Sequence, residues 1–148
     1  MDDTDRDIIN AIQSDYPITS RPYLELGNRF EMTESEVLKR VRRLKERGII
    51  RRIGANFNSK KLNFTSTLCA AKVPKEKLAG FVEKVNSYSG VTHNYLRDHE
   101  YNVWFTFIAP SAATVEKALK EITETTGVPE IRNLPAVKTY KIKVDFEV

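Results

Sequence analysis

The chain is poor in the residues that build disulfide frameworks and metal centres. It holds one cysteine, Cys69, and two histidines, His93 and His99, among 148 residues. A single cysteine excludes an internal disulfide and is typical of proteins of the reducing cytoplasm, where we expect this chain. One cysteine and two histidines are also too few to complete a structural zinc site.

Long apolar runs and secretion signals are missing as well. No stretch approaches the length of a membrane-spanning helix, and the acidic start of the chain is unlike a signal peptide. The sequence contains no glycine-rich phosphate loop and no recognisable Ser/His/Asp or Cys/His catalytic set. Its composition, 41% hydrophobic and 30% charged, is normal for a soluble globular protein. We therefore expect no membrane association.

Positive charge is abundant in one segment, although the net charge is only +4. Between residues 39 and 52 the only acidic residue is Glu46, and the basic residues are Lys39, Arg40, Arg42, Arg43, Lys45, Arg47, Arg51 and Arg52. Such a patch attracts polyanions, of which nucleic acid is the usual first candidate. A solvated helix face is the alternative interpretation, and charge alone does not separate the two.

The first third of the sequence predicts a winged helix-turn-helix domain over residues 1–60. Apolar residues at helical spacing predict a helix over 5–14, and Pro22 suits the first turn of a second helix. The run Thr33-Glu34-Ser35-Glu36 is a capping box that begins a third helix, which Gly48 ends. The third helix would be the recognition helix, and the alternating residues 49–55 would form the strand of a wing.

The remainder, residues 61–148, alternates between strand and helix patterns after a linker over 56–64. We expect strands over 65–73, 91–97, 101–109 and 137–148, and helices over 74–87 and 111–126. The order β-α-β-β-α-β predicts a ferredoxin-like domain, so the whole chain is expected to be α+β. Two helices would cover one face of the sheet. The other face needs a second subunit or a large ligand, because exposed aromatic residues would make it sticky.

The predicted hairpin over 93–107 carries both histidines and the only tryptophan, Trp104. Side chains alternate along a strand, so His93, Tyr95 and Arg97 are expected on one face, and His99 at the hairpin tip. Imidazole and guanidinium groups beside aromatic rings suit a flat, anionic, metal-bearing ligand. Each residue also has a structural explanation, as a packing or solvated side chain.

Two local expectations follow from the same alternation. Of Trp104 and Phe105, one should pack under the helices while the other lies on the open face. Cys69 lies between apolar neighbours in the first strand of this half, so we expect a buried, inert thiol.

The sequence resembles the Lrp/AsnC regulators along its whole length and, more specifically, the siroheme decarboxylases of the same superfamily. The matching segments are Arg51-Arg52-Ile53-Gly54-Ala55, His93-Asn94-Tyr95-Leu96-Arg97 and Tyr101-Asn102-Val103-Trp104-Phe105-Thr106. In the regulators the hairpin turns through a glycine followed by Asp-Tyr-Asp, whereas here it reads His99-Glu100-Tyr101-Asn102. The missing glycine belongs to the effector-binding region, which argues against amino-acid sensing.

The resemblance implies a siroheme decarboxylase subunit, which removes the two acetate carboxyl groups of siroheme to give 12,18-didecarboxysiroheme in haem or haem d1 biosynthesis. It implies a paralogous partner subunit, or a homodimer, and no cofactor beyond the iron of siroheme, with bound haem or siroheme as ligand. The alternative function is that of a DNA-binding Lrp/AsnC-type regulator, in one version haem-responsive.

The resemblance also implies roles for particular residues. His93, His99 and Tyr95 are predicted to be catalytic, and the predicted substrate-binding residues are Arg97, Tyr101, Trp104, Arg51 and Arg52. Iron accepts imidazole readily, so one histidine, with His93 as the candidate, would be an axial ligand and the other a proton donor. Arg97 suits a bidentate grip on a carboxylate. Three interpretations stay open for Arg51 and Arg52: holding carboxylates, contacting phosphate, or lying in solvent.

Overall fold

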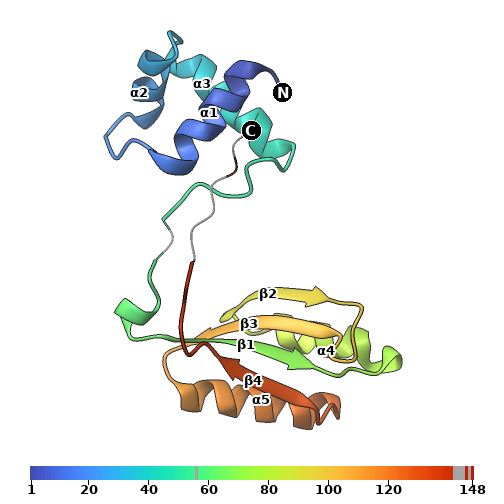
Figure 1. Ribbon diagram of the computed structural model, residues 1–148. Helices are drawn as coiled ribbons and strands as arrows, with labels where there is room; N and C mark the ends of the chain where they lie inside the picture. The colour runs from blue at the N-terminus through green and yellow to red at the C-terminus, as the bar shows by residue number, and fades with distance from the viewer. Residues whose placement is uncertain (56, 142–145, 147) are drawn as a thin grey trace. The chain divides into compact units, whose positions relative to one another are not determined.

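A computed structural model of the chain describes residues 1–55, 57–141, 146 and 148, in two compact units (Figure 1). One unit contains Met1–Ala55 together with Lys141–Val148, and the other contains Asn56–Tyr140. The predicted domain bounds, 1–60 and 61–148, stay a prediction beside this division. Each unit has its own apolar core.

The N-terminal unit is built on three helices: α1 (Asp3–Ser14), α2 (Pro22–Arg29) and α3 (Glu34–Glu46). Its core consists of Ile8, Ile9, Leu26, Val37, Val41, Leu44 and Ile50. The predicted capping box at α3 is confirmed: the Glu36 N–H donates to the Thr33 hydroxyl, and the Glu36 carboxylate accepts from the Thr33 N–H at 2.9 Å. The capping box therefore fixes where α3 begins, and the apolar residues of the three helices determine which sides face the core.

The predicted wing strand is wrong, because residues 49–55 form no strand. Gly48 has a φ of 72°, and after it the backbone reverses direction and folds against the end of α3. The N–H groups of Ile49 and Ile50 both donate to the Leu44 carbonyl, at 3.0 and 3.2 Å, and Ile50 is buried. The alternation of apolar and basic residues here therefore reflects the anchoring of isoleucines against the helices, and not a β-ladder.

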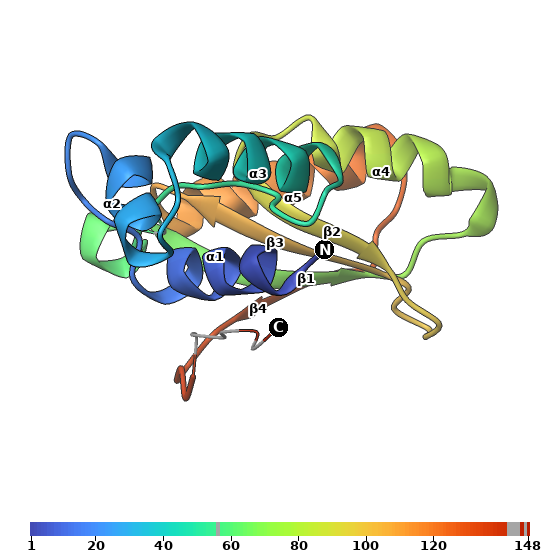
Figure 2. The same cartoon turned by 90° about the horizontal axis from the view of Figure 1, so that it is seen from above.

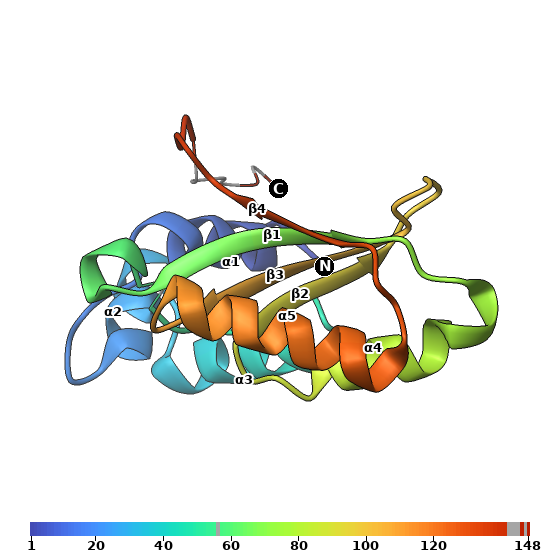
Figure 3. The ribbon, with the colours of Figure 1, turned by 90° about the horizontal axis from the view of Figure 1, so that it is seen from below.

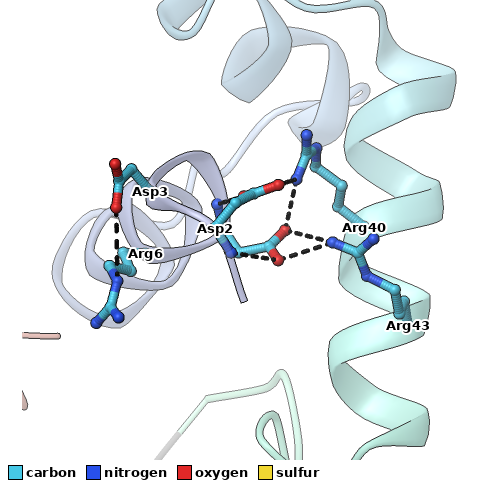
Figure 4. Close-up of polar contacts among 6 residues, drawn as sticks. Asp2, Asp3, Arg6, Arg40 and Arg43 are labelled. Atoms are coloured by element: carbon cyan, nitrogen blue, oxygen red, sulfur yellow. Dashed lines mark hydrogen bonds and ion pairs between the residues drawn. The ribbon is translucent and has the colours of Figure 1, made fainter.

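Helix α1 is tied to α3 by ion pairs, and Figure 4 shows Arg40 and Arg43 of α3 beside Asp2 at the start of α1. Asp5, whose side chain is 0% exposed, belongs to the same network. The Arg40 guanidinium donates to Asp5 at 2.8 Å and to Asp2 at 2.7 Å, and Arg43 donates to Asp5 at 2.7 Å. Burial alone would raise the pKa of Asp5. The hydrogen bonds from Arg40 and the Asp2 N–H, with the charge of Arg43, outweigh burial and hold that pKa below its ordinary value.

We expect Asp5→Ala to lower the free energy of unfolding of this unit by about 1–3 kcal/mol, because it leaves two guanidiniums without their shared carboxylate. The solvent exposure of Arg40 and Arg43, 26% and 50%, keeps the loss below that of a fully buried pair. Urea denaturation followed by circular dichroism measures it. Asp3→Ala, whose side chain is exposed, is the control, and an equally small loss in both variants would contradict the expectation.

The same carboxylate makes the stability of the N-terminal unit depend on pH. Its folded pKa lies below its unfolded value of about 4, so its contribution is complete above that pH and is lost as the pH falls through the folded pKa. The difference in stability between Asp5→Ala and the unchanged chain should therefore shrink on acidification. A difference that stayed constant from neutral pH to below the folded pKa would refute this.

The second unit is a four-stranded antiparallel sheet with two helices on one face (Figure 3). Its strands are β1 (Thr65–Ala71), β2 (Val91–Leu96), β3 (Val103–Ala109) and β4 (Ile131–Pro135), in the spatial order β2-β3-β1-β4 (Figure 2). The covering helices are α4 (Leu78–Asn86) and α5 (Ala112–Thr126), and two short 3₁₀ turns are η1 (Lys60–Leu62) and η2 (Lys75–Lys77). The predicted βαββαβ plan and the α+β class are confirmed.

The last strand is not where the sequence predicted it. Instead of 137–148, β4 spans Ile131–Pro135 and pairs with β1 from Ile131 opposite Ala71 to Pro135 opposite Thr67. In this register the start of β1, Thr65, lies opposite residue 137, so later residues have no partner in β1. Residues 137–141 form no strand. Residues 142–145 and 147 of the predicted strand lie outside the described residues.

The core of the second unit lies between the sheet and its helices. It includes Phe81 and Val85 of α4, Val115, Leu119 and Ile122 of α5, and Val103, Phe105, Phe107 and Ala109 of β3. Cys69 is also buried here, and burial raises the pKa of its thiol to about 12, which confirms the expected inert cysteine. Among the described residues no helix has both the length and the apolarity needed to cross a membrane.

Candidate functional site

The face of the sheet opposite α4 and α5 carries three of the residues that the sequence singled out: His93, Tyr95 and Trp104. Paired residues of antiparallel strands lie on the same face. Along one row Tyr95 pairs with Trp104, Trp104 with Ala70, and Ala70 with Arg132. Along the next row His93 pairs with Thr106, Thr106 with Leu68, and Leu68 with Leu134. These eight side chains define the surface that we call the open face.

The structure confirms that His93 and Tyr95 share this face, and that Trp104 lies on it while its neighbour Phe105 is buried. Arg97 continues the line of β2: its N–H donates to the Asn102 carbonyl at 2.7 Å, and its guanidinium lies 5.8 Å from the centre of the Trp104 ring. A cation over an aromatic ring is favourable. An imidazole, a phenol and a guanidinium therefore border one surface, as period-two alternation predicted.

The pairing of β2 with β3 shifts its register between Val91 and His93, as it does at a β-bulge. Bulges re-aim side chains at functional edges of sheets. Here the Thr92 hydroxyl lies 3.0 Å from His93 Nδ1, and the His93 and Tyr95 rings stack with centroids 6.0 Å apart. The imidazole is thus held at Nδ1 and against Tyr95.

Arg132 is the residue that the sequence analysis missed. Its guanidinium lies 4.4 Å from the centre of the Tyr101 ring, so it brings a second cation to the open face. The sequence does contain a signal, because the basic Arg132 follows the apolar Ile131 in the short strand Ile131–Pro135. It could be used only with the correct position of the last strand, which the sequence analysis placed too late.

The tip of the β2–β3 hairpin, residues 97–102, projects beyond the end of the sheet (Figures 2 and 3). The Asn102 side chain accepts from the Val73 N–H and donates to the Val73 carbonyl, both at 2.9 Å. Lys72 pairs with Glu100 at 2.6 Å and lowers the pKa of that carboxyl by its hydrogen bond. The tip is therefore fastened to the chain that follows β1, and it borders a hollow of about 440 Å³.

We expect Asn102→Ala to cost about 1–3 kcal/mol in the free energy of unfolding, because it leaves the partly buried amide and carbonyl of Val73 without partners. Asn102→Asp keeps the acceptor and loses the donor, so its loss should be smaller. Chemical denaturation of the two variants measures the difference. Equal stability of Asn102→Ala and the unchanged chain would show that the two hydrogen bonds between Asn102 and Val73 do not stabilise the hairpin tip.

Arg51 and Arg52 belong to the N-terminal unit, where both are exposed. The open face is therefore formed without them, and their substrate-binding role stays a prediction. No cluster of three or more His, Cys, Asp or Glu residues suited to a metal ion occurs in the described part of the chain. A metal carried by a ligand would meet individual imidazoles instead.

A larger cavity, of about 610 Å³, lies elsewhere in the second unit. Its walls include Phe64, Tyr88, Phe107, Thr114, Lys117 and Glu121, and none of the predicted site residues lines it. Its walls contain no arginine or histidine, and the one cation there, Lys117, is accompanied by the acidic Glu121. The open face and the hairpin tip are the better candidate.

Comparison with known families agrees with both halves of the fold. Residues 61–141 match the AsnC-like ligand binding domain, and residues 5–51 match the siroheme decarboxylase NirDL-like HTH domain. The siroheme decarboxylase alpha subunit of Desulfovibrio desulfuricans is 57% identical over 148 residues, covering 100% of this chain and 85% of that protein. The siroheme decarboxylase NirD subunit of Pseudomonas aeruginosa is 36% identical, covering 99% of this chain and 96% of that protein.

Among solved structures, the crystal structure of the siroheme decarboxylase NirDL in co-complex with an iron-uroporphyrin III analogue is similar, with a TM-score of 0.68 and 33% identity. The match covers 93% of this chain and 46% of that chain. Two family matches and the identity over the full length lead to the same assignment. The chain belongs to the siroheme decarboxylase family, within the AsnC-like proteins.

Proposed function

We propose that this chain is a subunit of a siroheme decarboxylase, a carboxy-lyase that releases the two acetate carboxyl groups of siroheme as carbon dioxide and yields 12,18-didecarboxysiroheme. The observation that carries the proposal is the open face, where His93, Tyr95 and Arg97 lie along one edge beside Trp104. The naming of relatives 57% identical as siroheme decarboxylase alpha subunits supports the same reaction.

The open face suits this substrate physically. Siroheme is a flat macrocycle that bears iron and many carboxylates. Trp104, Tyr95 and the apolar side chains of Leu68 and Leu134 offer a wall for the ring plane, since the two leucines are 41% and 42% exposed. The guanidinium of Arg97 grips a peripheral carboxylate, and Tyr101 and Trp104 line the site.

Decarboxylation breaks the bond between the acetate methylene carbon and the carboxylate carbon. The electron pair passes into the macrocycle, carbon dioxide leaves, and the methylene carbon gains one proton to become a methyl group. The protein has to orient the carboxylate, exclude water from it and provide the proton. We assign these tasks to His93, His99 and Tyr95, with no cofactor beyond the iron that siroheme itself carries.

The open face also implies a partner. Tyr95 is 52% exposed, and Leu68 and Leu134 of the same surface are 41% and 42% exposed. A paralogous subunit, or a second copy of the chain, would cover this surface with the tetrapyrrole held between the two sheets. We place the complex in the cytoplasm, where the free thiol of Cys69 stays reduced.

Anaerobic incubation with siroheme tests the function directly. The chain is co-expressed with its paralogous subunit, and mass spectrometry of the extracted tetrapyrrole should show the loss of two carbon dioxide units. Lys117→Ala, in the wall of the cavity that the site does not use, is the matched control and should react like the unchanged complex. A bound but unaltered tetrapyrrole would instead favour a haem-responsive regulator.

A DNA-binding role is less well supported. Arg40 and Arg43 of the basic helix α3 are paired with Asp2 and Asp5. The other cations of that helix, all exposed, are Lys39, Arg42 and Lys45. We expect only weak, salt-sensitive binding to duplex DNA in fluorescence anisotropy. Nanomolar binding to a palindromic site at physiological salt, with indifference to siroheme, would favour the regulator.

A further inference from the structure

The two histidines of the candidate site are held by different hydrogen bonds. His99 Nδ1 accepts from the backbone N–H of Tyr101 at 3.0 Å. A backbone N–H can only donate, so Nδ1 must present its lone pair to it. The ring proton of His99 is then on Nε2, and a doubly protonated imidazolium cannot accept this bond.

This arrangement is built into the hairpin tip and does not depend on a ligand. On either side of Tyr101, Glu100 pairs with Lys72 at 2.6 Å, and the Asn102 side chain binds Val73 at 2.9 Å. The His99 N–H donates to the Arg97 carbonyl at 3.1 Å, and the His99 ring lies beside the Tyr101 ring at 6.4 Å. The backbone amide that selects the tautomer is therefore fixed in place.

His93 is under no such restriction. Its Nδ1 lies 3.0 Å from the Thr92 hydroxyl, which can either donate or accept a hydrogen bond. When Nδ1–H donates to that hydroxyl, Nε2 keeps a free lone pair, as an iron ligand requires. Of the two imidazoles, only His93 has a neighbour that permits this tautomer without breaking a backbone hydrogen bond.

We infer that His99 is a neutral Nε2–H donor that binds a carboxylate of the substrate, and that it is neither the iron ligand nor the source of the proton. Ligation of the iron then falls to His93. The assignment of a carboxylate as the acceptor rests on the proposed function, whereas the tautomer of His99 follows from the hairpin alone. A neutral imidazole is a poor acid but a good hydrogen-bond donor, and Arg97 two residues earlier supplies the matching charge.

Nitrogen-15 NMR of the ring nitrogens tests the tautomer without substrate. The full chain, labelled in histidine and bound to its unlabelled partner subunit, has only two imidazoles to assign, and His99→Gln identifies which signals belong to His99. We expect a protonated Nε2 and an unprotonated Nδ1. A proton on Nδ1, or an averaged mixture of the two tautomers, would overturn the inference even if decarboxylation were established.

Variants test the role. We expect His99→Ala to raise KM for siroheme roughly 10- to 100-fold, as for a lost hydrogen bond to a charged group, while the visible band of the iron-ligated tetrapyrrole stays unchanged. His99→Gln, which retains a side-chain N–H, should recover much of the affinity. Loss of the ligand band in His99→Ala would contradict the inference. If the unchanged complex neither binds nor converts siroheme, the proposed function fails, and the NMR result still decides the tautomer.

Discussion

His93→Ala is expected to remove the nitrogen ligand of the substrate iron and to lower kcat/KM for siroheme by at least about 100-fold, since even outer partners of a metal ligand are worth 10–100-fold. The reason is geometric. His93 lies on the open face, and its ring contacts Thr92 through Nδ1 and stacks on Tyr95, while no residue of the described part of the chain hydrogen-bonds to its Nε2. The visible spectrum of the anaerobic complex and single-turnover decarboxylation measure the two effects separately.

Asn94→Ala is the matched control for this variant. Asn94 is the next residue of β2, but its side chain hydrogen-bonds to Asn86 of α4 at 2.9 Å on the opposite side of the sheet. It should retain the ligand band and the activity. If His93→Ala kept both the ligand band and the turnover of the unchanged complex, the axial role of His93 would be refuted.

Arg97→Ala should weaken transition-state binding by about 2–4 kcal/mol, which corresponds to roughly 30- to 1000-fold in kcat/KM. Arg97 lies over Trp104 and lines the hollow beside the hairpin tip, so a carboxylate bound there would lose its charged partner. Arg97→Lys keeps the charge but not the planar two-pronged donor, so we expect it to recover only part of the loss.

Arg132→Ala distinguishes a direct contact between Arg97 and a carboxylate from a general effect of positive charge on the open face. Arg132 is also on the open face, where it stacks on Tyr101, and its removal lowers the charge by the same amount. We expect a smaller effect than for Arg97→Ala. Steady-state kinetics of the three variants at two ionic strengths would show this order. Equal losses for Arg97→Ala and Arg132→Ala would mean that net charge, and not a bound carboxylate, matters.

The sequence predicts well those elements whose signals are local. The capping box at Thr33 and Glu36, the stop at Gly48 and the apolar spacing of α3 each depend on neighbours within a few residues, and all of them are present in the structure. Alternation along β2 likewise predicts that His93 and Tyr95 share one face of the sheet, and alternation along β3 predicts that Trp104 and Phe105 lie on opposite faces. All of these features depend on residues that are close together in the sequence.

The predictions fail where the structure of a segment depends on contacts with residues distant in the sequence. Residues 49–55 alternate like a strand, but Ile50 is used by the helical core and the backbone bonds back to Leu44. The end of the chain alternates too, yet Ile131–Pro135 reaches β1 first after the short connection from α5. Arg132 was missed for that reason. The acidic partners of Arg40 and Arg43 lie 35 to 38 residues away in the sequence. A count of charges between residues 39 and 52 therefore could not show that these two arginines form ion pairs.

A crystal structure of this chain with its paralogous subunit and siroheme, grown without oxygen, tests the placement of the substrate most directly. The iron should lie within bonding distance of His93 Nε2, with one carboxylate against Arg97 and His99 Nε2 and the ring plane along Trp104. A tetrapyrrole found instead in the cavity beside Tyr88 and Glu121, with the open face free of it, would contradict the site proposed for this protein.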